Sequence, residues 1–395
     1  ERGLEAEEAL SEALASELLN GSDIWLGAGT EAGRRAALWD GWRQRGEASD
    51  RAVTIHLGID PLGALAARGA VPRPLAELVD EAVHTAARAA DRAAARAADR
   101  AADHRAGSTT LTISTVAYQE AGADLATELG FALAALVDYL SSARAAGLET
   151  AQILPQVAWR FAVGCQVFPE IAKLRAARLL WRAICGAAGL ERVPPLALHV
   201  VGSRRTYALR EPQINLLRAS QQGVIATCGG ATAVSLPPYD AVGRTPSERG
   251  RRLARAIPLV LEHEGRLGRV ADPAAGAYVV EAATRRLAEA AWELAQEVER
   301  RGGMARELLS GAAGERVEAA WRERRRTYEA KRAGLTGVTD YVDDGARVLP
   351  AGERVELSVD ETEEEEVCGE RIERFRLRRD AEPYETDGAE SGGTA

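Results

Sequence analysis

Short apolar stretches alternate with longer helical patterns over most of the chain, and this alternation restricts the fold more than any other feature. Strands that are each followed by a helix form βα units, in which the strands are parallel and the crossovers right-handed. Strands this apolar indicate a sheet whose faces are covered. The expected strands are 22–29, 53–60, 110–118, 156–164, 196–203 and 231–240, and the clearest helices are 124–147, 170–189 and 214–230.

Six βα-type units in series favour a TIM-type (β/α) barrel over a doubly wound sheet within the α/β class. A doubly wound sheet more often has a glycine-rich turn of the form G-x-G-x-x-G after its first strand, and this pattern is absent from the sequence. Because a closed barrel of this class has eight strands, we expect an incomplete barrel.

Composition divides the chain into three parts. We expect the partial barrel over residues 1–281, with a first helix over 1–20. A helical extension over 282–340 should contain two amphipathic helices, with a break at Gly302-Gly303. Residues 341–395 hold 17 acidic and 7 basic residues, so we expect an acidic tail or linker that is largely disordered.

Charge and composition exclude several classes of partner. The 42 acidic and 43 basic residues before position 341 leave the body of the chain near neutral, and nucleic-acid binding needs a basic face. No run approaches 18 consecutive apolar residues, so we expect no membrane span. Four widely spaced cysteines without a CxxC pattern, and an N-terminus without the layout of a signal peptide, predict free thiols and a cytoplasmic location.

Residues 84–106 form a low-complexity, Ala- and Arg-rich stretch with high helix propensity. Its arginines recur at every fourth position and so share one helix face: Arg88, Arg92, Arg96 and Arg100. We favour a solvated helix face here, and the alternative is a basic surface for a CoA phosphate or an acidic partner.

The residue types that carry chemistry are few. The five histidines show no zinc spacing and no neighbouring cysteine, so we expect no metal site. His56 and His199 lie in expected strands, where a histidine is more often a satisfied core group than a catalyst. Asp60 and the segment Tyr118–Gly122 each follow a strand, at the face where barrels keep their active sites, but both also suit turns. The motifs of serine hydrolases, P-loop NTPases and dinucleotide-binding proteins are absent.

Five segments are more specific than these single residues. They are QEAG (119–122) with the helix after it, EIAKLRAARLLW (170–181), REPQINLLRA (210–219), GRVADPAAGAYVVE (268–281) and ERRGGM (299–304). In this order they resemble methylmalonyl-CoA mutase and its relatives, the cobalamin-dependent acyl-CoA mutases, over roughly residues 50–340. Residues 59–69 and 268–281 are most similar to the small, non-catalytic subunit of the heterodimeric bacterial enzymes.

The resemblance also implies which positions should carry the chemistry, and this chain departs from the pattern at those positions. The histidine of the Tyr-His-x-x-Glu-Ala-Gly motif, which hydrogen-bonds the thioester carbonyl in active members, is replaced by Ala117. The Arg-Leu-Ser that contacts CoA corresponds to residues 156–158 (Gln-Val-Ala). The glutamine of His-x-Gln is replaced by Val201, and the glutamate at the adenosyl ribose by Ala241. Alanine can neither donate a proton nor polarise a carbonyl, and because the family's groups are lost at all of these positions, we expect no catalytic residue in this chain.

A remnant of the pocket is expected at the carboxyl-terminal face of the barrel. Its candidate residues are His199, Arg204, Arg205, Tyr118 and Glu120. The two adjacent arginines could hold phosphates of CoA, although surface charge is the interpretation we favour.

The resemblance implies adenosylcobalamin as the cofactor of the family, held by a C-terminal domain with an Asp-x-His-x-x-Gly motif. The present sequence lacks that motif, and residues 376–385 resemble the linker that leads to the domain. We therefore expect no cobalamin-binding domain here, no cofactor bound by this chain alone, and adenosylcobalamin in its partner. The resemblance also predicts a first barrel strand before Glu1 and a missing strand-helix unit between residues 30 and 53.

The favoured interpretation is a non-catalytic subunit that pairs with a catalytic large subunit as a heterodimer and binds acyl-CoA weakly or not at all. The complex would interconvert methylmalonyl-CoA and succinyl-CoA. The alternative is a catalytic acyl-CoA mutase chain whose cobalamin domain is a separate polypeptide. A repurposed relative with an unrelated binding role is a third interpretation.

Overall fold

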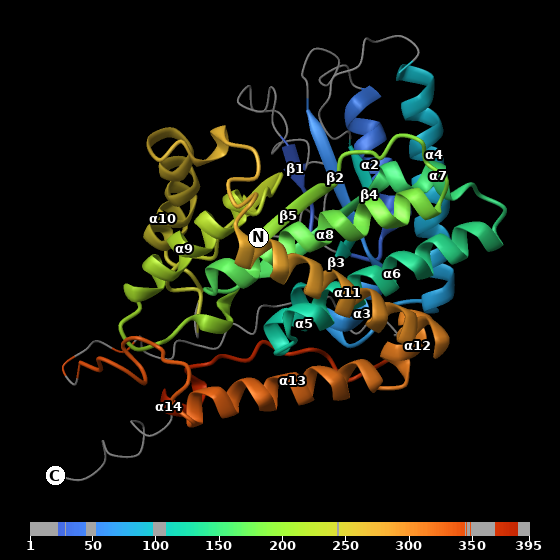
Figure 1. The fold of residues 1–395 in the computed structure, drawn as a ribbon. Helices are drawn as coiled ribbons and strands as arrows, with labels where there is room; N and C mark the ends of the chain where they lie inside the picture. Colours follow the sequence, from blue (N-terminus) through green and yellow to red (C-terminus); the bar gives the residue numbers. More distant parts are fainter. Residues whose placement is uncertain are drawn as a thin grey trace.

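The computed structural model describes residues 23–27, 29–44, 53–97, 108–242, 245–343, 345, 348 and 368–385. In this part of the chain, six parallel strands form one sheet in sequence order, and helices surround it (Figure 1). The strands are β1 (Asp23–Trp25), β2 (Thr54–Ile59), β3 (Thr109–Ser114), β4 (Val157–Val163), β5 (Ala197–Gly202) and β6 (Ala233–Ser235).

The helices alternate with the strands up to β6 and then follow one another. They are α2 (Ala32–Gln44), α3 (Pro61–Arg68), α4 (Leu75–Ala97), α5 (Val116–Ala121), α6 (Leu125–Ala145), α7 (Thr150–Ile153), α8 (Val167–Ala187), α9 (Ile214–Cys228), α10 (Glu248–Leu259), α11 (Tyr278–Arg300), α12 (Gly303–Leu309), α13 (Ala312–Glu329) and α14 (Glu382–Glu385). Short 3-10 or π turns are η2 (Leu154–Gln156), η3 (Arg204–Thr206), η4 (Val260–Glu264) and η5 (Leu267–Arg269).

An aromatic contact across the sheet shows how strongly the sheet is curled. The ring of Trp25 on β1 stacks on His56 of β2, with 3.6 Å between centroids, and lies 4.9 Å from the ring of His199 on β5. In a flat sheet, four strand spacings would separate β1 from β5 by about 19 Å. The sheet therefore closes almost into a barrel, and the expected incomplete TIM-type α/β barrel is confirmed.

The strand register places apolar and polar side chains on opposite faces of the sheet. Trp159 and Leu198 are paired in register and belong to the buried hydrophobic core. Ser114, Arg160 and His199 are paired in register one residue further along each strand, so they lie together on the other face. Because successive residues of a strand point to opposite faces, the apolar face meets the helices and the polar face lines the barrel interior.

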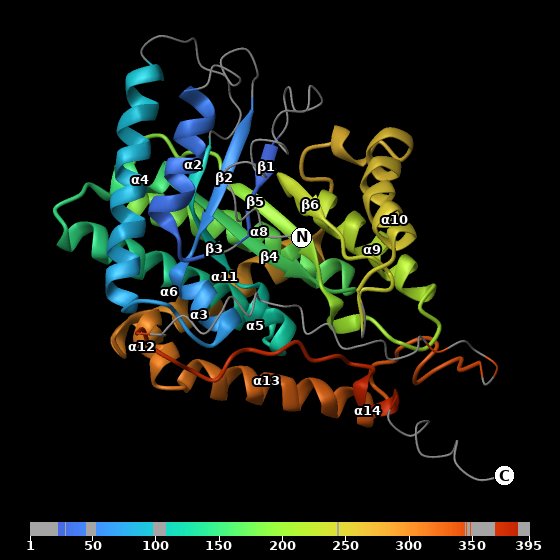
Figure 2. The same ribbon diagram turned by 180° about the vertical axis from the view of Figure 1, so that it is seen from behind.

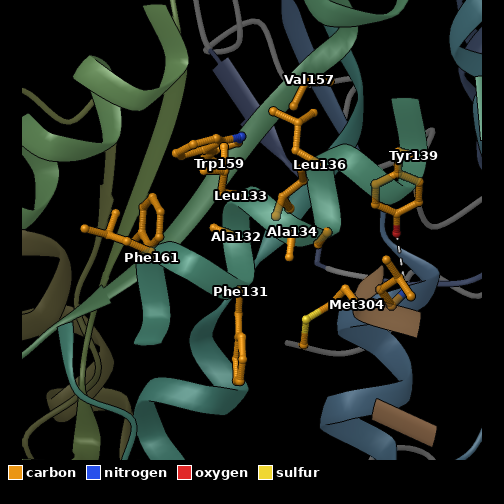
Figure 3. Packing of buried hydrophobic residues seen from close by; sticks show 14 of the residues in the cluster. Phe131, Ala132, Leu133, Ala134, Leu136, Tyr139, Val157, Trp159, Phe161 and Met304 are labelled. Carbon is orange, nitrogen blue, oxygen red and sulfur yellow. Dashed lines mark hydrogen bonds between the residues drawn. The ribbon is translucent and has the colours of Figure 1, made fainter. Parts of the chain in front are cut away.

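The main core lies between the apolar face of the sheet and the surrounding helices. Phe131 and Leu136 of α6 pack in the same cluster as Trp159 of β4 (Figure 3). By length and composition α6 could span a membrane, but 61% of its apolar stretch is buried inside the fold, where it contacts α4, α8 and α11. This helix is thus a core helix of the barrel.

A buried cluster of charges holds the carboxyl end of β4. The Nζ of Lys173 on α8 lies 2.7 Å from Oε2 of Glu128 on α6 and 2.7 Å from Oε2 of Glu170 on α8, and it donates a hydrogen bond to the carbonyl oxygen of Ala162 on β4. None of the three charged side chains is more than 3% exposed. Burial lowers the pKa of Lys173, but the two carboxylates outweigh that effect and raise it above its usual value.

Within the expected acidic tail, residues 368–385 run along α13 on the surface of the barrel (Figures 1 and 2). The N–H groups of Arg378 and Asp380 donate to the carbonyl oxygens of Glu120 and Arg205, at 2.9 and 2.8 Å. The buried carboxylate of Asp380 lies 2.6 Å from Nη2 of Arg324. This part of the expected linker is packed against the barrel, and most of the remaining tail lies outside the described residues.

Three expected strands are shorter than their apolar patterns suggested, and the one expected over 22–29 is reduced to β1. The strand expected over 110–118 ends at Ser114, because the next residues form α5 and the N–H of Gln119 donates to the carbonyl of Thr115. The strand expected over 231–240 is reduced to β6. Pro237 and Pro238 follow it, and proline has no N–H group to continue a ladder.

The helical expectations change in detail. The segment 30–53 contains α2, and β1 pairs directly with β2, so the sheet is continuous there. The two helices expected over 282–332 are three in the described structure, because Gly311, with φ of 83°, adds a second break to the expected one at 302–303. Since α11 begins at Tyr278, the proposed boundary at 281 falls inside this helix. The helix expected over 1–20 lies outside the described residues.

Of the expected arginine face, the structure describes the part that lies on α4. Arg92 forms an ion pair with Asp40 of α2, at 3.0 Å, and its side chain stays 41% exposed. Arg88 donates to the hydroxyl of Thr85 on the same helix. These contacts agree with a largely solvated face, and the remainder of the stretch is outside what the structure describes.

We expect Lys173→Met to lower the free energy of unfolding by about 3–5 kcal/mol, because it leaves two buried carboxylates without their cation. Urea unfolding at pH 7 measures this change. The sequence contains only one other lysine, Lys331, which is exposed. Lys331→Met is therefore the matched control, and a loss below about 1 kcal/mol for Lys173→Met would contradict the role assigned to the cluster.

Candidate functional site

The barrel interior brings together the two strand histidines. His56 Nδ1 lies 2.7 Å from the hydroxyl of Thr109, and His199 Nε2 lies 2.9 Å from the hydroxyl of Ser235. The ring of Trp25 contacts both imidazoles. The histidines are thus members of one buried group that also includes an aromatic side chain, which the sequence did not single out.

Burial sets the protonation state of both histidines. It lowers the pKa of His56 to about 4. Burial, followed by the nearby charges of Arg160 and His56, lowers the pKa of His199 to about 3. Both imidazoles are therefore neutral at pH 7 and weakly basic, so neither is suited to proton transfer near neutral pH. They act here as hydrogen-bonded interior groups.

The four positions at which we expect the chain to lack the groups of active mutases are spread over the barrel. Ala117 is half-buried on α5, Val201 is buried on β5, and Ala241 follows β6. Gln156, just before β4, accepts a hydrogen bond from the hydroxyl of Thr110 at 3.0 Å. The first three side chains offer no polar atom, and the amide oxygen of the fourth is already used inside the barrel.

The structure brings three of the expected pocket residues together at the carboxyl ends of the strands. Arg204 meets Glu120 with two side-chain contacts, Nη2 to Oε2 at 2.7 Å and Nε to Oε1 at 3.1 Å. Arg205 is buried beside them and donates through Nη1 to the carbonyl oxygens of Gln119 and Ala123, at 2.7 and 3.1 Å. The expected surface-charge role therefore does not hold for Arg205, which is only 4% exposed.

The other two expected pocket residues lie elsewhere. Tyr118 is buried in the hydrophobic core, where its ring meets Phe131 and Phe375 edge to face. It points away from the pocket because the segment after Ser114 is a helix, which turns successive side chains by about 100° instead of alternating them. His199 belongs to the interior group with Trp25, separate from the Arg204–Glu120 pair.

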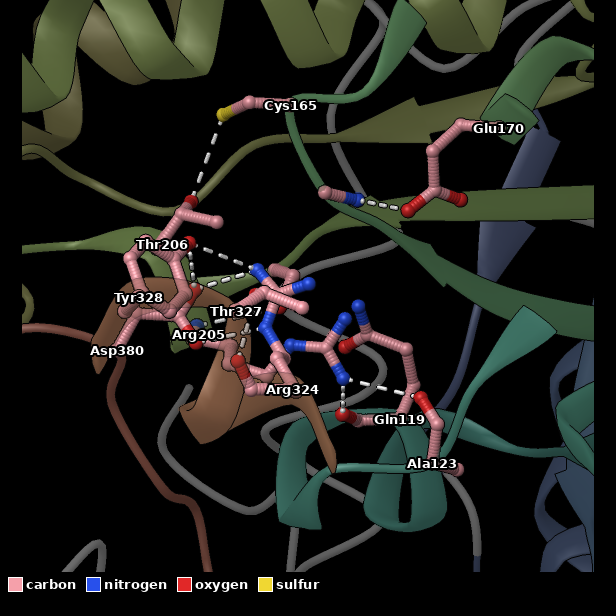
Figure 4. Close-up of polar contacts among 12 residues, drawn as sticks. Gln119, Ala123, Cys165, Glu170, Arg205, Thr206, Arg324, Thr327, Tyr328 and Asp380 are labelled. Carbon is pink, nitrogen blue, oxygen red and sulfur yellow. Dashed lines mark hydrogen bonds and ion pairs between the residues drawn. The ribbon is translucent and has the colours of Figure 1, made fainter. Parts of the chain in front are cut away.

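A cavity of about 120 Å³ lies at the carboxyl ends of β3 and β4. Its lining residues are Gly122, Ala123, Asp124, Leu125, Gly164, Cys165, Gln166, Glu170, Arg205, Ala320 and Arg324. Figure 4 shows Arg205 at the centre of the polar contacts in this region, with Glu170 and Cys165 on one side and Arg324 on the other. Of this set, only Arg205 was among the expected pocket residues.

The loop after β2 is structural. Asp60 caps α3 by accepting from the N–H of Gly63 at 3.0 Å, and it also accepts from the N–H of Ser114 and the hydroxyl of Tyr139, both at 2.8 Å. Burial raises the pKa of Asp60 to about 6, although these three donors oppose the shift. Of the two interpretations of this motif, its contacts favour turn and cap formation. The described residues also contain no group of three or more His, Cys, Asp or Glu that could hold a metal, so the absence of a metal site stays a prediction.

Replacing His199 with glutamine should change how stability depends on pH. The unfolded chain protonates this histidine near pH 6.5, whereas the folded chain does so only near pH 3. Its contribution to stability is therefore fully present above pH 6.5 and is lost as the pH falls toward 3.

We expect the difference in unfolding free energy between wild type and His199→Gln to shift by about 2 kcal/mol, to the disadvantage of wild type, between pH 7.5 and pH 5. Urea unfolding at both pH values measures the shift. His84→Gln, at an exposed position on α4, is the matched control for replacing a histidine. Parallel pH curves for wild type and His199→Gln would contradict the buried, neutral state of this imidazole.

Comparison with known proteins identifies the family. The family model of methylmalonyl-CoA mutase matches residues 42–387. The methylmalonyl-CoA mutase small subunit of Streptomyces virginiae is 35% identical over 332 residues, which are 84% of this chain and 51% of that protein. A probable methylmalonyl-CoA mutase small subunit of Mycobacterium bovis is 33% identical over 306 residues, 76% of this chain and 46% of that protein. The methylmalonyl-CoA mutase of Rhizobium meliloti is 33% identical over 275 residues, 69% of this chain and 38% of that protein.

The chain spans about half the length, or less, of these curated relatives. Two of the three are named small subunits, so the expected resemblance to that subunit is confirmed. The matched region contains strands β2 to β6 and the cavity described above. With these matches, the chain belongs to the methylmalonyl-CoA mutase family.

Proposed function

We propose that this chain is a non-catalytic, supporting subunit that pairs with a catalytic mutase large subunit as a heterodimer. One observation carries the proposal: the positions of the active-site groups are occupied by side chains without catalytic chemistry, Ala117, Val201 and Ala241 among them. General acid–base groups contribute about 10²–10⁴ in rate, so the loss of several leaves little catalytic power.

Three polar side chains of the barrel interior and its carboxyl end support the same proposal, because each has a partner within the chain. Glu120 is bound by Arg204, His56 by Thr109 and His199 by Ser235. A substrate that used any of these groups would have to break an existing buried contact, which costs free energy. We therefore propose that acyl-CoA binds to this chain weakly or not at all.

The described residues also fit adenosylcobalamin poorly, although it is the cofactor expected for the family. Ala241 offers only a methyl group, and Glu120 is already bound by Arg204. The packed segment around Arg378 and Asp380 is hydrogen-bonded to α5 and η3 at the same end of the barrel. We place the cofactor in the partner subunit for these reasons.

The shape of the sheet supports an obligate partner. The outer edges of β1 and β6 are the two edges of the described sheet, and strand edges present N–H and C=O groups that favour pairing or cover. Relatives named small subunits imply a larger companion. We propose that the complex interconverts methylmalonyl-CoA and succinyl-CoA in the cytoplasm.

We also propose that the chain divides into three parts. These are a barrel over 1–281, a helical extension over 282–340 and a tail over 341–395.

Co-expression with the mutase large subunit of the same organism tests the proposal. We expect a one-to-one complex by size-exclusion chromatography with light scattering, mutase activity in the complex, and none in this chain alone. Activity of this chain when it is supplied with a separate cobalamin-binding protein would instead establish the alternative, a catalytic chain. Failure to form a complex would overturn the proposal.

Substitution of His199 in the assembled complex tests whether the barrel interior of this chain takes part in the reaction. We expect His199→Gln to leave kcat per assembled complex within about twofold of wild type, because catalytic groups contribute at least about 10²-fold. Light scattering on the same sample separates loss of assembly from loss of catalysis. A drop of tenfold or more in an intact complex would mean that this interior is catalytic.

A further inference from the structure

The cavity at the carboxyl ends of β3 and β4 borders the first residues of two long helices, and the proposed function does not involve it. It lies where α6 and α8 begin, since Asp124 and Leu125 at the start of α6, and Gln166 at the start of α8, are among its lining residues. Each of these helices has 21 residues. Helix N-termini carry partial positive charge and N–H groups without intrahelical acceptors, both of which favour a bound anion.

Arg205 adds a full positive charge to this cavity. Arg205 is only 4% exposed, and its side chain lines the cavity. Its Nη1 donates hydrogen bonds to two backbone carbonyl oxygens. Its Nε has no acceptor, and among the described residues no carboxylate is hydrogen-bonded to this guanidinium. Burial and the neighbouring Arg324 lower the pKa of Arg205, as expected for a cation that lacks a bonded anion.

The side-chain amide of Gln119 is a second unsatisfied group at the same place. This residue is fully buried, and neither its Oε1 nor its Nε2 has a hydrogen-bond partner in the described structure. Figure 4 shows the amide next to the guanidinium of Arg205. Buried polar groups are almost always paired, so two neighbouring unsatisfied groups indicate that something outside the chain completes the site.

The other charged groups around the cavity are already paired. Glu170 binds Lys173 through one carboxylate oxygen and the N–H of Gly164 through the other. Arg324 is bound by the buried carboxylate of Asp380. Asp124 also lines the cavity, and its carboxylate accepts a hydrogen bond from the N–H of Thr127 and so caps α6. Arg205 is therefore the lining cation that has no carboxylate hydrogen-bonded to it.

We propose that this cavity binds a small oxyanion, of the class of inorganic phosphate or a short-chain carboxylate, held by Arg205 and the N-terminus of α8, which no side chain caps. A cavity of about 120 Å³ is smaller than the roughly 300–1,000 Å³ pockets of drug-sized ligands, so it excludes an entire CoA or nucleotide. The site does not depend on the supporting role proposed above, because all of its described groups belong to this chain.

Thermal unfolding of the full chain tests the site, with phosphate and acetate as separate probes and chloride at equal ionic strength as reference. We expect a saturable rise in Tm with at least one oxyanion that chloride does not produce. A rise with phosphate alone identifies a phosphate site, and a rise with acetate identifies a carboxylate site. A response identical to that of chloride for both probes would overturn the proposal.

Two pairs of variants test whether the anion binds in this cavity. Arg205→Gln should weaken anion binding at least tenfold, while the matched control Arg204→Gln should retain it, because Arg204 pairs with Glu120 and does not line the cavity. If Arg205→Gln fails to fold, Ala320→Leu fills the cavity from α13 without removing a charge, and Ala319→Leu is its exposed control. Equal binding by Ala320→Leu and Ala319→Leu would place the anion elsewhere and overturn the proposal.

The alkylation rate of Cys165, which lines the cavity, tests independently where the anion binds. We expect the bound anion to slow alkylation of Cys165 by iodoacetamide at least threefold, while the exposed Cys368 reacts at an unchanged rate. Peptide mass spectrometry measures both rates in one sample. Equal rates at Cys165 with and without the anion would overturn the location. Since the isolated chain is used throughout, this outcome is distinct from failure of the subunit to assemble with its partner.

Discussion

The buried contact between Lys173, Glu128 and Glu170 is the constraint on which the carboxyl end of the barrel depends. It joins α6 and α8 to each other and to the carbonyl oxygen of Ala162 on β4, with all three charged side chains nearly or fully buried. Burying charges is costly unless each is paired, so the three groups must be positioned together. This requirement sets where α6 and α8 begin, and therefore where the cavity between their N-termini lies.

The barrel interior shows how a pocket can keep polar residues and still be unsuited to proton transfer. His56 and His199 persist on their strands, but burial keeps both neutral and each is bound to a hydroxyl. Arg204 and Glu120 satisfy each other in the same way at the strand ends. These pairs stabilise the barrel and leave the two histidines and Glu120 less available to a substrate.

The surface of the same end is covered by elements that come late in the chain. Helix α13 supplies Arg324, which binds Asp380, and the backbone of residues 378–380 bonds to α5 and to η3. These contacts hold Arg205 in a buried position while leaving its Nε without an acceptor. A guanidinium buried in this way next to two helix N-termini is what distinguishes the cavity from an ordinary packing defect.

The sequence alone determined the alternation of strands and helices, the incomplete barrel and the family, because hydrophobic periodicity is local and the family motifs are contiguous. Through the family resemblance it also indicated positions where we expect no catalytic group, such as Ala117 and Val201. It did not predict the pairing of Arg204 with Glu120, the burial of Arg205, or the contact of Trp25 with His199. Those residues are far apart in the chain, and only the curl of the sheet and the packing of α13 bring them together. Whether an arginine is solvated or buried, and whether a histidine is charged, depends on these non-local contacts, and so the tertiary structure decided the chemistry of the site.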